Sequence, residues 1–166
     1  DVAAEWIEQA SALLPSDPWV HFNLGVACQK LAELDKAIMA FRRALQLKPD
    51  YVEAQIRLSG MLLEQGRLDE AIGACRRALE LKPDCTEAHN NLGTALSQMG
   101  QLDDGLASFR HAIELKPDYA EAHNNLGGAL KRQGLLDESM RAYSRAVELQ
   151  PDAAEMHSNL VYAALF

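Results

Sequence analysis

The chain has 166 residues, 48% of them apolar, which is enough for one globular domain with a buried core. Its formal net charge of −8 argues against binding to nucleic acid or to an anionic membrane, because both require a basic protein surface. Its apolar runs are too short to span a membrane, its first residues lack a signal-peptide pattern, and its three cysteines form no Cys-x-x-Cys pair, so we expect a soluble, cytoplasmic protein with reduced thiols.

The sequence repeats with a period of 34 residues. The segment HNNLG, for example, occurs at 89–93 and again at 123–127. Proline recurs at the same interval, at Pro15, Pro49, Pro83, Pro117 and Pro151. A strict period of this length indicates a solenoid, in which each repeat buries its apolar face against the next. We divide the chain, in order, into a half repeat at 1–17, full repeats at 18–51, 52–85, 86–119 and 120–153, and a half repeat at 154–166.

Each full repeat is expected to form two helices, and the third repeat shows the pattern most clearly. Apolar residues recur in it at helical spacing on either side of Gly100, where a glycine in the left-handed conformation would end the first helix. Pro117 ends the second helix. Asp118 and Glu121 then have the spacing of a capping box at the start of the next helix. The fold class is therefore all-α.

The first full repeat carries an apolar helix face formed by Trp19, Phe22 and Val26, which lie three and four residues apart. As an exposed cluster, these side chains could anchor a partner. Alternatively, they pack against the half repeat that precedes them or against an earlier repeat, and we favour this packing.

One row of asparagines runs through the first helices, directly before the leucine of each Leu-Gly pair or its counterpart. This position holds Asn23, Arg57, Asn91, Asn125 and Asn159, so Arg57 of the second repeat interrupts the row. A primary amide has both donors and an acceptor, and it can bond the main chain of an extended peptide whatever the peptide's side chains are. The alternative is that these amides bond within the solenoid or to water. The preceding position holds Phe22, Ile56, Asn90, Asn124 and Ser158, so it is apolar in the early repeats and polar in the later ones.

Other recurring polar residues point to structure rather than to chemistry. The row of Glu53, Glu87, Glu121 and Glu155 could select basic peptides, but we favour a capping role. The row of His21, His89, His123 and His157 tempts a metal interpretation. Packed helices lie about 8 to 10 Å apart, whereas zinc requires ligand nitrogens at about 2.0 to 2.1 Å, so we expect interhelical packing instead. We expect no metal, no cofactor and no enzymatic activity in this chain, because no nucleophile has a base in reach.

The pattern resembles the tetratricopeptide repeat family. In the fourth repeat the family's positions hold His123, Leu126, Gly127, Leu130, Ser139, Tyr143, Ala146 and Pro151. The resemblance covers the whole chain and implies a right-handed superhelical solenoid of antiparallel helix pairs, whose first helices line a concave groove. It further implies a protein interaction module that binds an extended segment of a partner. The expected groove residues are Trp19, Phe22, Asn23, Arg57, Asn90, Asn91, Asn124, Asn125 and Asn159.

The segment AHNNLG and the tail AEMHSNLVYAALF are similar to the repeats of O-linked N-acetylglucosamine transferases. This resemblance implies a second hypothesis, that the chain is the acceptor-binding part of a glycosyltransferase whose catalytic domain lies beyond Phe166. A third hypothesis is a self-assembling scaffold, because apolar residues occur at both ends of the chain. They are Trp6, Ile7, Leu160, Leu165 and Phe166.

Overall fold

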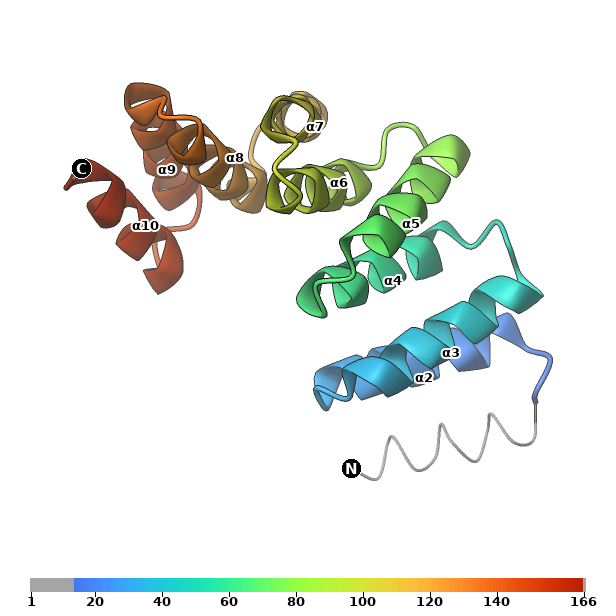
Figure 1. Cartoon of the computed structure of the whole chain (residues 1–166). Helices are drawn as coiled ribbons and strands as arrows, with labels where there is room; N and C mark the ends of the chain where they lie inside the picture. Colours follow the sequence, from blue (N-terminus) through green and yellow to red (C-terminus); the bar gives the residue numbers. More distant parts are fainter. Residues whose placement is uncertain (1–13, 166) are drawn as a thin grey trace. The chain divides into compact units, whose positions relative to one another are not determined.

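A computed structural model describes residues 14–165, and in that part of the chain every regular element is an α-helix (Figure 1). The expected all-α fold is thus confirmed there. The helices, in chain order, are α2 (Pro18–Lys30), α3 (Leu34–Leu47), α4 (Val52–Glu64), α5 (Leu68–Leu81), α6 (Thr86–Gln98), α7 (Leu102–Leu115), α8 (Ala120–Arg132), α9 (Leu136–Leu149) and α10 (Ala154–Ala164). Within the described residues, no helix is long and apolar enough to cross a membrane.

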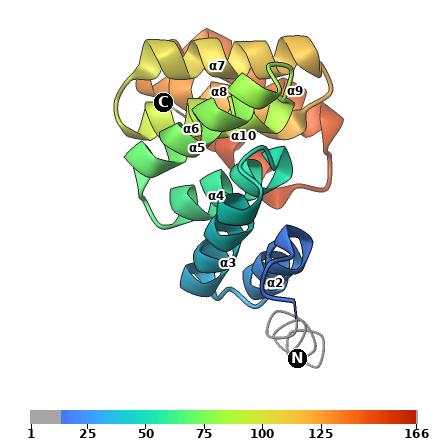
Figure 2. The same ribbon diagram turned by 90° about the vertical axis from the view of Figure 1, so that its right-hand side faces the viewer.

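The helices fall into two compact units, one ending at Pro83 and the other beginning at Asp84. In the N-terminal unit α2 pairs with α3 and α4 pairs with α5, while α3 packs on α4. In the C-terminal unit α6 pairs with α7 and α8 with α9, α7 packs on α8, and α10 packs on α9 (Figure 2). Helix α8 also contacts both α6 and α10, so three first helices adjoin in this unit.

Within a pair, the two helices approach closely where a glycine of the first faces an aromatic ring of the second. A Cβ atom added at Gly93 would lie 2.7 Å from the Phe109 ring and 3.0 Å from the Gly105 carbonyl oxygen. At Gly25 it would lie 2.5 Å from the Phe41 ring. Contacts this short leave no room for a side chain, so glycine at this position sets the helix separation.

The second repeat achieves the same packing with different residues. Ser59 and Cys75 occupy the glycine and aromatic positions there, and both are fully buried. A larger residue on one helix is thus matched by a smaller one on the other. Cys28 and Cys85 are also buried, so all three cysteines serve as small core residues.

The helix ends agree with the sequence at the first-helix C-termini. Gly100 adopts a left-handed φ of 84°, as predicted, and Gly66 and Gly134 do the same. Ala32 occupies the corresponding turn of the first repeat with a φ of 57°. A non-glycine residue is strained in this region, because its Cβ approaches the following carbonyl group.

The capping-box prediction was wrong. Helix α8 begins after Tyr119, and no side chain caps its first turn. The turn is closed instead by a backbone bond from the Tyr119 N–H to the Lys116 carbonyl oxygen (3.1 Å). A side chain also contacts this turn, because Nε2 of His123 lies 3.0 Å from the Pro117 carbonyl oxygen. The same contact recurs from His21 to Pro15 at 3.0 Å and from His157 to Pro151 at 2.7 Å.

Candidate functional site

A buried amide links the third and fourth repeats. Asn90 is only 1% exposed, and its Nδ2 donates to Oε1 of Glu121 at 3.0 Å. Its Oδ1 accepts from Nδ2 of Asn125 at 3.1 Å. A carboxylate can only accept, so the Asn90 amide must present its nitrogen to Glu121 and its oxygen to Asn125. The acidic row therefore supports the interface between repeats here, where a capping role was expected.

The next pair of repeats uses the same contact. Nδ2 of Asn159, on α10, donates to Oδ1 of Asn124, on α8, at 3.0 Å. Asn124 is half-buried, and within residues 14–165 this is the one hydrogen bond found for its side chain. Asn125 and Asn159 each use Nδ2 inside the solenoid, while the described residues supply no donor to their Oδ1 atoms. The row thus retains acceptors that a ligand can use.

The N-terminal unit places its candidate residues differently. Asn23 donates from Nδ2 to the Trp19 carbonyl oxygen of its own helix at 3.0 Å, and Arg57 is exposed. Phe22 packs against Phe41 and against Tyr51, the residue directly before α4, with ring centroids 5.7 and 4.9 Å away. Phe22 is thus a packing residue within the first repeat, at the position that Asn90 occupies in the third.

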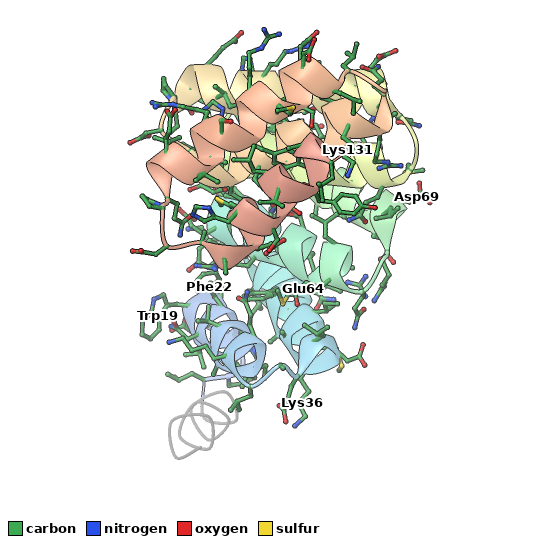
Figure 3. The ribbon with its side chains drawn as sticks, turned by 90° about the vertical axis from the view of Figure 1, so that its left-hand side faces the viewer. Trp19, Phe22, Lys36, Glu64, Asp69 and Lys131 are labelled. Atoms are coloured by element: carbon green, nitrogen blue, oxygen red, sulfur yellow. The ribbon has the colours of Figure 1, made fainter. Side chains whose placement is uncertain are left out.

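Trp19 differs from Phe22 although both lie on α2, as Figure 3 shows. Its side chain is 64% exposed, and its backbone N–H is held by Oδ1 of Asp17 at 2.8 Å. Packing of this ring against residues 1–13 falls outside the described part of the chain. Asn91 lies half-buried on α6, one turn before Ala95.

The Tyr119 side chain contacts Glu121, the carboxylate that accepts from the buried Asn90 amide. Its hydroxyl donates to Oε2 of Glu121 at 3.4 Å, and the ammonium group of Lys116 lies 5.4 Å from its ring centroid. Burial, the Glu121 carboxylate and the Glu87 carboxylate raise the pKa of the Tyr119 phenol well above its usual range. The hydroxyl therefore stays protonated and remains a donor to Glu121.

A pocket of about 250 Å³ opens across α6, α8 and α10 in the C-terminal unit. Its wall includes the rings of Phe109 and Tyr143 from the second helices. Apart from the Tyr143 hydroxyl, its polar side chains come from the three first helices. They include Thr94, Gln98, Asn124, Asn125, Arg132 and Asn159. Three of the predicted groove asparagines are therefore brought together at one hollow.

Two features of this pocket come from glycine and tyrosine in the fourth repeat. Gly128 leaves space above Tyr143, because a Cβ atom added there would lie 3.4 Å from the Tyr143 hydroxyl. Tyr143 is 5% exposed, and no hydrogen bond to its hydroxyl is found among residues 14–165. Burial raises the pKa of this phenol, so it is a neutral donor.

Arg132 supplies the charge of the pocket. Its Nη1 donates to the Ser97 carbonyl oxygen at 2.6 Å, which fixes the guanidinium near the end of α6. The described lining contains no carboxylate. Arg132 and Tyr143 were not among the predicted site residues. The usable signals were the Gly127-Gly128 pair and the hydroxyl of Tyr143, where the first and third repeats have phenylalanine.

Comparison with known proteins agrees with this architecture. Two family models, both described as tetratricopeptide repeat, match residues 90–154 in one case and residues 32–96 and 62–107 in the other. Together they span residues 32–154. The chain belongs to the tetratricopeptide repeat family. A comparison with curated proteins gives no match.

Solved structures share the fold. TTC0263, a thermophilic tetratricopeptide repeat protein of Thermus thermophilus, is 22% identical with a TM-score of 0.83, over 98% of this chain and 89% of that one. MamA residues 41 to the end, from Desulfovibrio magneticus RS-1, is 21% identical with a TM-score of 0.80, over 91% and 85%. Another MamA structure is 22% identical with a TM-score of 0.79, over 92% and 89%. At these identities the likeness defines the fold alone.

Proposed function

We propose that the chain is a protein interaction module and that its C-terminal unit binds an extended peptide segment of a partner across α6, α8 and α10. Tetratricopeptide repeat proteins generally mediate interactions between proteins, so the coarse function follows the family. The observation that carries the finer proposal is the amide-lined pocket at which Asn124, Asn125 and Asn159 meet. Neutral amides of this kind suit a peptide main chain, which offers both donors and acceptors.

The repeat distance fits an extended ligand. Packed helices lie about 8 to 10 Å apart, and a polyproline-II segment advances about 9.3 Å per turn of three residues. Amides on successive first helices would therefore meet every third peptide residue. The unused Oδ1 atoms of Asn125 and Asn159 would accept peptide N–H groups, while their Nδ2 atoms remain in the solenoid.

The experiment is selection of random twelve-residue peptides displayed in the interior of a carrier protein, followed by affinity measurement on the selected peptides. Asn159→Ala removes one acceptor, and each neutral hydrogen bond contributes about 0.5 to 1.5 kcal/mol. We expect this variant to bind all selected peptides about two- to ten-fold more weakly, whatever their sequences. Ser144→Ala on α9, outside this pocket, is the control and should leave affinity unchanged. Failure to select any peptide would overturn the proposal.

A second candidate is the acceptor-binding part of a glycosyltransferase. It rests on the similarity of AHNNLG and of the tail to the repeats of O-linked N-acetylglucosamine transferases. In that case the bound segment would be the acceptor protein, and the chemistry would occur in a separate domain. Reading the gene beyond the codon for Phe166 tests this candidate, since a long α/β continuation would support it and its lack would remove it.

A third candidate is self-association, which an apolar surface on α10 favours. Val161, Tyr162 and Leu165 are 59%, 56% and 71% exposed. Leu160, which the sequence suggested for this role, is half-buried. Trp6, Ile7 and Phe166 lie outside the described residues. A second copy could cover the exposed face of α10, and the oligomeric state is its test.

A further inference from the structure

We propose that the pocket across α6, α8 and α10 is a specificity site for an acidic side chain, aspartate or glutamate, within the bound segment. This inference rests on the proposed function. Arg132 is a cation at the rim, and the described lining contains no carboxylate to neutralise it. The chain has a formal net charge of −8, and Arg132 is the one charged side chain in the described lining of this pocket.

The hydrogen-bonding groups that remain available in the pocket are well matched to a carboxylate. A guanidinium has five donors, and the bond from Arg132 to the Ser97 carbonyl oxygen uses one of them. The Tyr143 hydroxyl and Nδ2 of Asn124 add donors for which the described residues provide no acceptor. An ionised carboxylate only accepts, and charge-assisted bonds to it are stronger than neutral ones.

These features occur together in one repeat only. Arg132, Tyr143 and Gly128 correspond by the 34-residue period to Gln98, Phe109 and Thr94 in the third repeat. The second repeat has Glu64, Cys75 and Gly60 at the same positions. The positive charge of Arg132, the hydroxyl of Tyr143 and the space left by Gly128 therefore occur together in the fourth repeat alone, as expected for a specific contact.

The size and surroundings of the pocket favour a side chain over a whole ligand or a chain end. Its volume of about 250 Å³ is below the roughly 300 to 1,000 Å³ of pockets that enclose drug-sized molecules. Acceptor oxygens for main-chain N–H groups lie on both α8 and α10, at Asn125 and Asn159. A segment held by both helices passes the pocket and directs a side chain into it.

The same random-peptide selection tests the inference, because peptides inside a carrier have no free terminus. We expect the selected peptides to share one aspartate or glutamate. Synthetic peptides with acetylated and amidated ends should retain binding, and replacing the acidic residue by its amide should weaken it about ten-fold or more. If a free terminal carboxylate restores binding to the amide peptide, the pocket recognises chain ends and the inference is overturned.

Two variants copy residues that the third repeat already carries, so both should fold. Arg132→Gln and Tyr143→Phe should each lose the preference for the acid over its amide, with the larger loss for Arg132→Gln. Arg141→Gln on α9 has the same change of charge outside this pocket and should keep the preference. Peptides that bind without acidic preference would overturn the inference and leave the proposed function standing, whereas an empty selection would overturn both.

Discussion

Nδ2 of Asn125 donates to Oδ1 of Asn90 at 3.1 Å, and Asn90 is 1% exposed. Asn125→Ala would remove the only group that the described residues provide for this buried oxygen. An unsatisfied buried acceptor costs about 1 to 3 kcal/mol, so we expect a decrease of that size in the free energy of unfolding. Asn159→Ala leaves the half-buried Asn124 open to water and should cost less than about 0.5 kcal/mol. Chemical denaturation of both variants checks the contrast, and equal costs would contradict it.

The two glycines at positions 73 and 93 should respond in opposite directions to the same substitution. Gly93→Ala places a Cβ atom 2.7 Å from the Phe109 ring, and overpacking of this kind destabilises by about 1 to 3 kcal/mol. Gly93→Leu should cost more. Gly73 has no neighbour within 4 Å of an added Cβ atom, so Gly73→Ala should stabilise α5 by about 0.5 to 1 kcal/mol. Thermal unfolding midpoints that move together for the two alanine variants would refute this packing.

Ala32 offers a stabilising substitution. Its φ of 57° costs about 1 to 2 kcal/mol for a residue with a Cβ atom, whereas glycine adopts it freely. Glycine also increases the entropy of the unfolded chain by about 0.4 to 1 kcal/mol. We therefore expect Ala32→Gly to gain up to about 1 kcal/mol, and Gly100→Ala at the corresponding turn to lose a similar amount. Differential scanning calorimetry should show the two melting temperatures on opposite sides of the parent.

Gly128→Thr should separate binding from stability. Threonine occupies the corresponding position, Thr94, in the third repeat, and a Cβ atom at 128 would make an ordinary contact with the Tyr143 hydroxyl. The threonine side chain would fill the space above that hydroxyl. We expect an unfolding free energy within about 0.5 kcal/mol of the parent. Titration calorimetry should show at least about ten-fold weaker binding of acidic peptides. Unchanged affinity would place the acidic side chain elsewhere.

The apolar face of α10 should support self-association at high concentration. Val161 and Leu165 are exposed on this helix, and burying them against another copy would release water from apolar surface. Sedimentation equilibrium from the micromolar to the millimolar range should show reversible association of the parent. Val161→Lys combined with Leu165→Lys should remain monomeric. A parent that stays monomeric throughout this range would disprove the role of α10.

The helices were predictable because the residues that end them recur every 34 residues. Glycine in a left-handed turn and proline after the second helix act locally, and Gly100 behaves as its neighbours in sequence indicate. The capping box failed because its residues had a competing use. Glu121 has a buried amide to bond, and the backbone of Tyr119 closes the turn without the Asp118 side chain.

The asparagine rows were visible in the sequence, but their pairing was not. Asn90 and Asn125 are 35 residues apart and belong to different rows, so only the stacking of α8 on α6 shows that they meet. Arg132 was missed for a similar reason. It stands near the end of a helix among other charged and polar residues, and its position at a pocket depends on the Ser97 carbonyl of the preceding repeat.

The contact between Asn90 and Asn125, which joins two repeats, also restricts how such an array can change in evolution. Deletion or duplication of 34 residues would keep the helical phase, but it would give some repeats a new neighbour. If the first repeat were placed directly before the fourth, Phe22 would take the position of Asn90, and Glu121 and Asn125 would face a ring instead of an amide. The residues that contact the next repeat thus constrain the order of the repeats. Recombination should be tolerated best between repeats in which these residues have the same polarity.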